Sequence, residues 1–380
     1  MADAPLVGVR VLDLSQMYPG AFCSLLLADL GADVVKVERP GAGDGMRAMA
    51  APGTFNAAHT AFNRGKRSVV VDVRNEHAGD ALRPLVRWAD LVLESSRPGQ
   101  LDEIGLGYEA MRAENPALVW CSITGFGTTG PNALAGGHDL TFLGTSGLLS
   151  QLSDGDPRPP ATTISLPLAG SLAAAGLLAA LLAATRTGQG RRLEVSMNEA
   201  ASWVLSEDVA RQANAPAPGW GSFAARNVYE CADGRNVTVA ATEPRTWATL
   251  CEALEDTTLA EHQHGRDEPA AIERLAKLFA TKDAAAWAER PGLAGGVGAV
   301  LDPADLLTDA STTARGGVVK VEGGSTVLAS PIRWDGADGA ASSRGRSAPP
   351  DLGADTDQVL ASAGVASEDI DRLRAVGAIS

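Results

Sequence analysis

The sequence has few of the residues that build metal centres and disulfides. Its 380 residues include only four cysteines and five histidines. No pair of cysteines has the CxxC spacing of a zinc knuckle or a redox dithiol. His262 and His264 lie two positions apart, so they do not share one face of a helix. We therefore expect no metal site, and we interpret the cysteines as reduced residues of a cytoplasmic protein.

Positive charge is also scarce. The chain has 32 lysines and arginines against 46 aspartates and glutamates, a net charge of −14. This excess of acid repels phosphate backbones and anionic membranes, which argues against a nucleic-acid or membrane partner. It does not exclude a small anionic ligand held by a local basic cluster. Residues 1–5 contain neither the basic nor the apolar part of a secretory signal, which favours a cytoplasmic location.

One apolar run, from Leu166 to Ala184, is close to the length of a membrane span. The run is rich in alanine and contains Pro167, so we expect a buried core helix instead. The small residues Gly170 and Gly176 would let another backbone approach this helix closely.

The first half of the chain alternates between strand and helix patterns. The expected strands are Val7–Leu14, Asp33–Val37, Ser68–Val73, Asp90–Glu94, Leu118–Ile123 and Arg192–Ser196, and the expected helices are Phe22–Leu30, 76–88 and Glu109–Glu114. Pro19-Gly20 is expected to break the chain before the first helix. The alternation predicts an α/β fold with a parallel sheet and helices on its faces, in a large domain of residues 1–200.

The pattern changes after this domain. We expect a connector at 201–225 and a smaller α+β domain at 226–325, which contains a hairpin with an Asp233-Gly234 turn. Residues 326–380 then combine a linker, rich in Gly, Ser, Ala and Pro at 336–350, with a C-terminal segment that returns to the large domain.

Basic clusters lie near the ends of the expected strands. They are Lys36, Arg39 and Arg47; Arg64, Lys66 and Arg67; and Arg97. Because α/β folds bind ligands at the carboxyl ends of their strands, these cations favour a phosphate-bearing ligand, with solvated surface charge as the alternative. NAD or FAD is not indicated, since the turn at 15–20 has one glycine instead of GxGxxG.

His138 is the histidine best suited to chemistry. It follows Gly136-Gly137 and precedes a largely apolar segment, which can place it at a pocket wall. The ordinary pKa of histidine suits proton transfer at neutral pH. The alternative is a loop histidine that is satisfied by backbone groups.

Several long motifs make the chain resemble the family III CoA-transferases, a group that includes α-methylacyl-CoA racemase and carnitine CoA-transferase. The matching segments are Gly8–Leu14, Leu27–Pro40, Asn63–Ser68, Arg97–Gly99, Ser122–Gly127 and Asp351–Thr356. The resemblance implies a Rossmann-like large domain, a smaller α+β domain and two interlocked chains. It also implies a CoA thioester as substrate, with no tightly bound cofactor, in a groove formed by Arg39, Asn63, Arg64, Gly65, Lys66, Arg67, Ser96 and Arg97.

The resemblance also implies a catalytic centre made of His138, Asp139 and Glu243. His138 is similar to a base beside the substrate α-carbon in the racemase branch, and Glu243 to the glutamate that hydrogen-bonds it. A carboxylate behind an imidazole fixes its tautomer and raises its basicity.

Two positions depart from the family pattern. An aspartate usually precedes the Ala-rich helix, as the nucleophile of transferases or the second base of racemases, but here that position falls at Ser165 or Leu166. A serine cannot form the mixed anhydride of CoA transfer. Glu103 stands where an arginine commonly contacts CoA phosphates, so CoA binding would be weaker or the thioester would be on another carrier.

Three hypotheses follow. The first is an enzyme that uses His138 and Glu243 for α-proton chemistry (epimerisation, isomerisation or elimination), with backbone N–H groups at the start of the Ala-rich helix holding the oxyanion. The second is a CoA-transferase that uses another carboxylate. The third is a non-catalytic subunit that pairs with a paralogue, whereas the first two would suit a homodimer.

Overall fold

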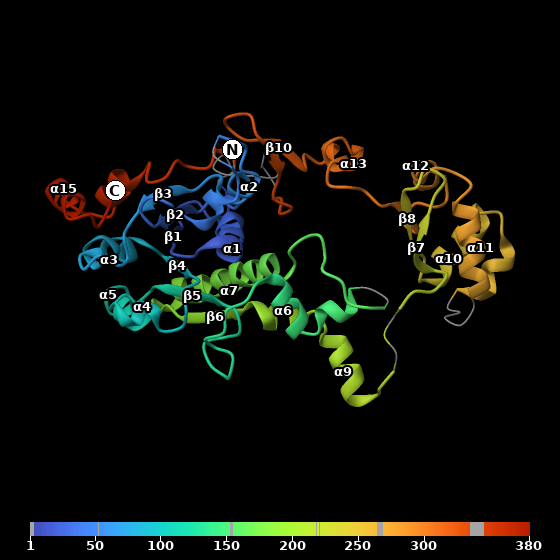
Figure 1. Cartoon of the computed structure of the whole chain (residues 1–380), viewed down its shortest axis with the longest axis horizontal. Helices are drawn as coiled ribbons and strands as arrows, with labels where there is room; N and C mark the ends of the chain where they lie inside the picture. Colours follow the sequence, from blue (N-terminus) through green and yellow to red (C-terminus); the bar gives the residue numbers. More distant parts are fainter. Residues whose placement is uncertain are drawn as a thin grey trace. The chain divides into compact units, whose positions relative to one another are not determined.

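The computed structural model describes residues 4–51, 53–152, 155–217, 219, 221–263, 269–334 and 346–380. The chain forms two compact units, Met1–Glu207 with Ser311–Ser380, and Asp208–Ala310 (Figure 1). The expected smaller domain ended at residue 325, but residues 311–325 group with the larger unit. There β10 (Val318–Lys320) pairs with β11 (Thr326–Leu328), and the Leu328 carbonyl accepts a hydrogen bond from Arg64.

The larger unit is built on a six-stranded sheet in the order β3-β2-β1-β4-β5-β6. The strands are β1 (Arg10–Asp13), β2 (Asp33–Glu38), β3 (Arg67–Val70), β4 (Leu91–Glu94), β5 (Val119–Thr124) and β6 (Arg192–Ser196). All neighbouring strands are parallel, which confirms the predicted Rossmann-like α/β class. The chain order reverses between β1 and β4, and doubly wound sheets bind ligands outside the carboxyl ends of such strands.

Successive side chains of each strand point to opposite faces of the sheet, and helices pack against both faces. Val11 and Val34 belong to a core with α1 (Met17–Asp29), α7 (Ser165–Thr187) and α8 (Met197–Trp203). Their neighbours Leu12 and Val35 belong to the opposite core, with α3 (Ala78–Trp88) and α5 (Tyr108–Glu114). The shorter elements are η1 (Gly45–Ala48), α2 (Ala57–Asn63), α4 (Gln100–Glu103), α6 (Asp139–Thr145), η2 (Leu148–Gln151), α9 (Ser206–Asn214) and α13 (Ala310–Ala314).

Helices α1 and α7 pack closely against each other. The expected break at Pro19-Gly20 is wrong, because α1 begins at Met17 and Pro19 occupies its first turn, where no intrahelical N–H bond is lost. A Cβ atom at Gly170 would lie 2.6 Å from the Pro19 carbonyl oxygen, so glycine permits this contact. In the described part of the chain, α7 alone is long and apolar enough to span a membrane, and a third of its most apolar window is buried. Its inner face packs on α1 and β5.

The C-terminal segment completes the sheet at its β3 edge. Helices α14 (Thr356–Ser362) and α15 (Ser367–Ala375) join the core that contains α3, and this segment lies beside β3 and α3 in Figure 1. The Asp355 carboxylate accepts the Ser68 N–H at 2.8 Å, and the Thr356 hydroxyl accepts the Val70 N–H at 3.2 Å. The edge of β3 is thereby covered. Most of the expected linker at 336–350 lies outside the described residues.

The smaller unit has an antiparallel sheet of β7 (Arg226–Glu230), β8 (Asn236–Ala240) and β9 (Val297–Ala299). The predicted hairpin turn connects β7 to β8. Helices α10 (Pro244–Ala253), α11 (Pro269–Phe279) and α12 (Ala284–Ala288) pack around Trp247, Phe279 and Trp287. Short 3-10 turns lie at η3 (Thr257–His262) and η4 (Asp305–Leu307). The unit is therefore α+β, as predicted.

The α1–α7 contact predicts a specific sensitivity at Gly170. Gly170→Ala should lower the free energy of unfolding by about 1–2 kcal/mol, because the added methyl meets backbone atoms that cannot move aside. Gly144→Ala in α6, where a Cβ atom meets nothing within 4 Å, should be neutral or slightly stabilising. Urea denaturation of both variants measures the difference. Equal effects at the two positions would contradict this account of the packing.

Candidate functional site

A groove of about 860 Å³ lies at the carboxyl edge of the large sheet. Its walls come from the segments that follow β1, β2, β3 and β4, and from α4. Gln16 after β1 and Ser95 after β4 line it on the two sides of the strand-order reversal, and the Gln16 N–H donates to the Ser95 hydroxyl at 2.9 Å. The groove therefore lies where doubly wound sheets bind their ligands.

Three arginines line this groove: Arg39, Arg74 and Arg97. Arg39, Ser96 and Arg97 were predicted from the sequence, and the structure brings these three together at the groove. Arg74 was not predicted, although its position directly after the third expected strand was the available signal. Glu103 also lines the groove, so an acidic side chain faces the same ligand space as the arginines.

The other predicted ligand residues are engaged elsewhere, and none of them is among the lining residues that define this groove. Arg64 and Asp29 form a buried ion pair at 2.5 Å, and each is 2% exposed. Lys66 is buried and donates to the Ala21 carbonyl and to the side chain of Asn63. Gly65 forms the left-handed turn between Arg64 and Lys66 (φ 73°).

Arg67 lies at the opposite edge of the sheet from the groove. It begins β3, and it pairs at 2.6 Å with Asp33, which begins β2. Parallel strands place both residues at the amino edge. Its guanidinium also lies over the Trp88 ring. These contacts give Arg67 a structural role in place of the predicted ligand contact.

Four buried charged residues form a cluster at the carboxyl ends of β1 and β2, next to the groove. Asp13, Lys36, Asp44 and Lys66 are at most 5% exposed. Lys36 lies 3.0 Å from Asp44 and 3.8 Å from Asp13. Burial lowers the pKa of Lys66 to about 7, against the attraction of Asp13. Asp44 also accepts the N–H of Met17, whose positive φ of 62° is unusual for a side chain of this size.

Glu38, at the end of β2, is a second buried acid near the groove. Its carboxylate accepts hydrogen bonds from Arg47 at 2.6 Å and from the Ser68 hydroxyl at 2.6 Å. Burial alone would raise the pKa of Glu38, but Arg47, Ser68 and the Asp44 N–H together lower it to about 2. The residue is therefore held as an anion that anchors Arg47.

His138 is exposed and precedes the first turn of α6. A Cβ atom at Gly137 would lie 2.7 Å from the buried Phe142 ring, so a glycine is required immediately before the histidine. Packing against Phe142 therefore explains why a glycine precedes the histidine. The His138 side chain itself lies on the surface of the larger unit.

Asp139 binds the start of α7. Its carboxylate accepts the N–H groups of Ile164, Ser165 and Leu166 at 2.8–3.3 Å and the Ser165 hydroxyl at 2.6 Å. A carboxylate at a helix N-terminus is stabilised by these donors and by the helix dipole. The expectation that these N–H groups hold an oxyanion is wrong, because Asp139 already occupies them. Ser165 is fully buried by the same contact.

Glu243 lies in the smaller unit. It immediately precedes α10, its backbone carbonyl accepts the Trp247 N–H, and its side chain is exposed. His138 and Glu243 therefore belong to different compact units, and their pairing stays a prediction.

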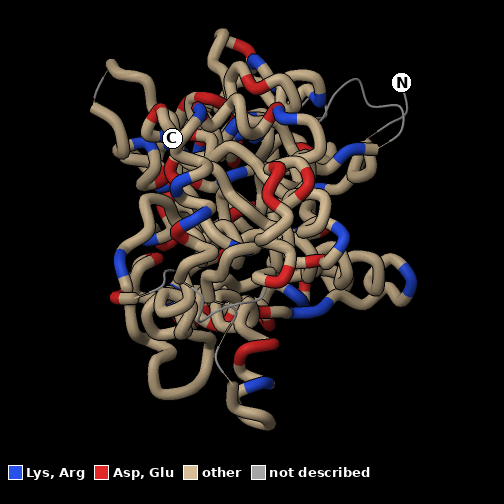
Figure 2. Tube along the Cα trace, turned by 90° about the vertical axis from the view of Figure 1, so that its right-hand side faces the viewer, with Lys and Arg blue, Asp and Glu red and all other residues tan. Residues whose placement is uncertain are grey.

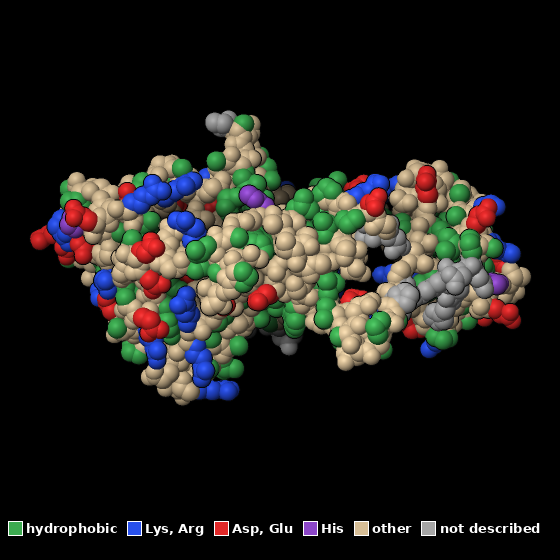
Figure 3. Space-filling view, turned by 60° about the horizontal axis from the view of Figure 1, so that its bottom comes forward, with side chains coloured by type: hydrophobic (Ala, Val, Ile, Leu, Met, Phe, Trp, Pro, Cys, Tyr) green, Lys and Arg blue, Asp and Glu red, His purple; other side chains and the backbone are tan. Residues whose placement is uncertain are grey.

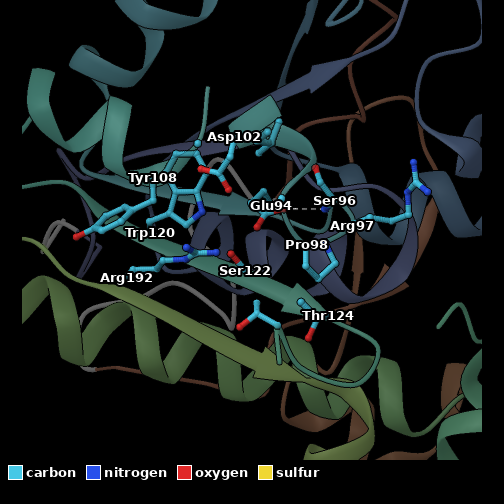
Figure 4. Close-up of a pocket in the computed structure, with 14 residues that line it drawn as sticks. Glu94, Ser96, Arg97, Pro98, Asp102, Tyr108, Trp120, Ser122, Thr124 and Arg192 are labelled. Carbon is cyan, nitrogen blue, oxygen red and sulfur yellow. Dashed lines mark hydrogen bonds between the residues drawn. The ribbon is translucent and has the colours of Figure 1, made fainter. Parts of the chain in front are cut away.

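A second, much smaller cavity of about 20 Å³ adjoins the groove and shares Ser96, Arg97 and Leu101 with it (Figure 4). Glu94, at the end of β4, lines this cavity and is 6% exposed. Its carboxylate accepts the Ser96 N–H at 2.6 Å. Burial raises the pKa of Glu94, although the Ser122 hydroxyl, the Ser96 bond and the charge of Arg192 oppose this effect.

The charge pattern is mixed elsewhere. Basic and acidic positions are interspersed along the trace in Figure 2. Within the described ranges, no group of three His, Cys, Asp or Glu side chains is placed to hold a metal ion. The four cysteines are buried and free of disulfides.

The comparisons with known proteins identify the family and agree with the fold. Residues 6–356 match CoA-transferase family III. The chain belongs to this family. It is similar to a CAIB/BAIF family protein from Brucella suis, with a TM-score of 0.82 and 29% identity over 95% of this chain and all of that one.

Family III relatives have two kinds of activity in their names. The chain is 38% identical over 212 residues to the succinate–glutarate CoA-transferase of Agrobacterium fabrum, about half the length of either protein (53%). It is 32% identical over 298 residues to human alpha-methylacyl-CoA racemase, covering 75% of this chain and 74% of the racemase. Family III enzymes act on CoA thioesters, and the chain is about as close to transferases as to racemases.

The environment of Glu38 predicts an acid-sensitive contribution to stability. A pKa lowered from 4.5 to about 2 stabilises the fold above pH 4.5, and this contribution is lost as the pH falls toward 2. Glu38→Gln should therefore cost about 3 kcal/mol at pH 7, and much less at pH 3. Urea titrations at both pH values measure the gap, with exposed Glu109→Gln as a control that changes little. A gap that is the same at pH 7 and pH 3 would contradict the assignment.

Proposed function

We propose that this protein binds a CoA thioester in the groove of the larger unit and catalyses α-proton chemistry with His138 as acid and base. Three arginines at the strand-order reversal support the ligand, because guanidinium groups bind phosphates through charge-assisted hydrogen bonds. The racemase relatives supply the precedent for an acyl-CoA substrate. The acyl group is a matter for experiment.

The chemistry needs one group that can both remove and return a proton. A thioester carbonyl acidifies the adjacent C–H bond, and an imidazole has a suitable pKa at neutral pH. His138 is exposed beside the start of α7. In this proposal Asp139 holds the loop that carries the imidazole, and the role of Glu243 as its orienting group stays a prediction.

The contact between Asp139 and Ser165 is the observation that carries the preference for proton chemistry over transfer. A transferase of the mixed-anhydride type needs a free carboxylate nucleophile. Ser165 offers a hydroxyl that is buried and bound to Asp139, and Leu166 offers no acid. The Asp139 carboxylate itself accepts N–H and O–H bonds, which lower its nucleophilicity.

CoA transfer remains the second candidate, because the transferases are as similar to the chain as the racemases are. In that case the nucleophile would be the carboxylate of Asp139, which belongs to α6 and is bound to the start of α7. It would have to attack the thioester. Such a step requires it to release the α7 N–H groups first.

We further propose that the larger unit associates with a second chain. Large apolar side chains are exposed on this unit, and Figure 3 shows apolar groups reaching the visible surface at several places. Examples are Leu134 at 76%, Trp203 at 67%, Val204 at 53% and Leu182 at 53% exposure. If the second chain is another copy of this protein, the assembly is a homodimer. If it is a paralogue that carries the aspartate, the assembly is a heteromer in which this chain is a non-catalytic subunit.

The groove assignment predicts which arginines matter for binding. Arg74→Ala should weaken CoA binding about tenfold, because one charge-assisted hydrogen bond to phosphate is lost. Arg67→Ala at the amino edge removes the same charge and should leave the affinity unchanged. Isothermal titration with CoA measures both. Equal losses for the two variants would show that the ligand lies elsewhere.

The proposed chemistry predicts α-proton exchange. In D₂O, the purified protein should exchange the α-proton of at least one 2-methylacyl-CoA, and His138→Ala should lower the rate by at least ~10²-fold. His77→Ala, a histidine before α3, is the matched control and should retain the rate. NMR or mass spectrometry follows the deuterium. If the purified homomer exchanges the α-proton of none of the 2-methylacyl-CoAs tested, the proposal is wrong, and the partner-subunit hypothesis is favoured.

A further inference from the structure

The small cavity beside the groove is lined by polar side chains that do not line the groove itself, among them Glu94 and Ser122. Ser122 is 1% exposed, and its hydroxyl makes no hydrogen bond of ordinary geometry among the described residues. It lies on β5, the neighbour of β4, and lines the same 20 Å³ space as Glu94, close enough to favour the ionised carboxylate. That volume is enough for a single water molecule. Glu94 is thus a nearly buried acid beside a small polar cavity.

Glu94 is connected to the groove through the turn that follows it. Its carboxylate accepts the Ser96 N–H, and Ser96 and Arg97 line both the cavity and the groove. Figure 4 shows the bond between Glu94 and Ser96, with Arg97 on the same turn. One carboxylate therefore fixes the shape of the groove wall and adds a negative charge directly behind it.

The charged and titratable groups around Glu94 come from every neighbouring element. They are Arg97 on the same turn, Asp102 on α4, Tyr108 on α5, Cys121 on β5 and Arg192 on β6. Burial opposes the ionised form of Glu94, whereas the hydroxyl of Ser122, the N–H of Ser96 and the charge of Arg192 favour it, and burial is the largest of these effects. A further negative charge in the adjoining groove would also oppose the ionised form.

We propose that Glu94 is a positioning residue that couples the affinity of the groove for an anionic ligand to pH. This inference rests on the proposed function, in which the groove binds a CoA thioester. Either form of Glu94 can accept the Ser96 N–H, so the wall keeps its shape. The ionised form also repels the phosphates of the ligand, and protonation removes that repulsion. The raised pKa of Glu94 brings this protonation closer to neutral pH.

The test separates the charge of Glu94 from its hydrogen bond. Glu94→Gln keeps an oxygen that accepts the Ser96 N–H but carries no charge. Glu94→Ala loses both. Glu109→Gln removes the charge of an exposed glutamate that lines neither the cavity nor the groove, so it is the matched control. CoA affinity is measured by isothermal titration for the full-length protein and each variant from pH 8 to pH 5.5. The ratio to wild type cancels the titration of the ligand's own phosphates.

At pH 8, Glu94→Gln should bind CoA at least ~3-fold more tightly than wild type, and this advantage should shrink as the pH falls toward 5.5. Glu94→Ala should bind more weakly than Glu94→Gln at every pH, and Glu109→Gln should follow wild type. A ratio for Glu94→Gln that stays at one, or that does not change with pH, overturns the inference even if Glu94→Ala fails to fold. If wild type itself binds no CoA, the groove assignment fails, and the inference fails with it.

Discussion

The fold of the carboxyl edge of the large sheet depends on a cluster of charges that are buried away from water. Asp13, Lys36, Asp44 and Lys66 come from β1, β2, the start of η1 and the turn before β3. Taking such groups out of water is costly, and each is stable there only because the others are present. The cluster therefore forces these segments to meet at one place. Asp44 also holds the N–H at the start of α1, so the same cluster fixes the first turn beside the groove.

The groove and the histidine turn illustrate two ways of making a site. The groove results from topology, because it lies at the carboxyl ends of β1 and β4, where the strand order reverses. The turn at His138 results from packing, because Gly137 lies against Phe142 and Asp139 holds the start of α7. The contact between Asp139 and the start of α7 thus fixes this turn independently of the groove.

The sequence predicted the strands of the large sheet well, since uninterrupted runs such as Val34 and Val35 in β2 have few alternatives to a buried parallel strand. The sequence patterns did not show where a residue lies within its helix or which distant residue it contacts. Pro19 signalled a break, but the first turn of a helix tolerates proline. Arg64, Lys66 and Arg67 signalled a ligand, but their partners Asp29, Asp13 and Asp33 lie more than 30 residues earlier in the chain. No local pattern distinguishes a paired arginine from a free one.

The C-terminal cover of β3 has a consequence for synthesis of the chain. Residues 355 and 356 bind the backbone of Ser68 and Val70, almost 290 positions earlier. A ribosome that has made the first five strands has therefore exposed a strand edge that the same polypeptide can cover only much later. Until then the nascent sheet has an open hydrogen-bonding edge, which favours association with other strands. Holding this edge apart is a natural task for a chaperone during translation, and premature termination before α14 would leave it open permanently.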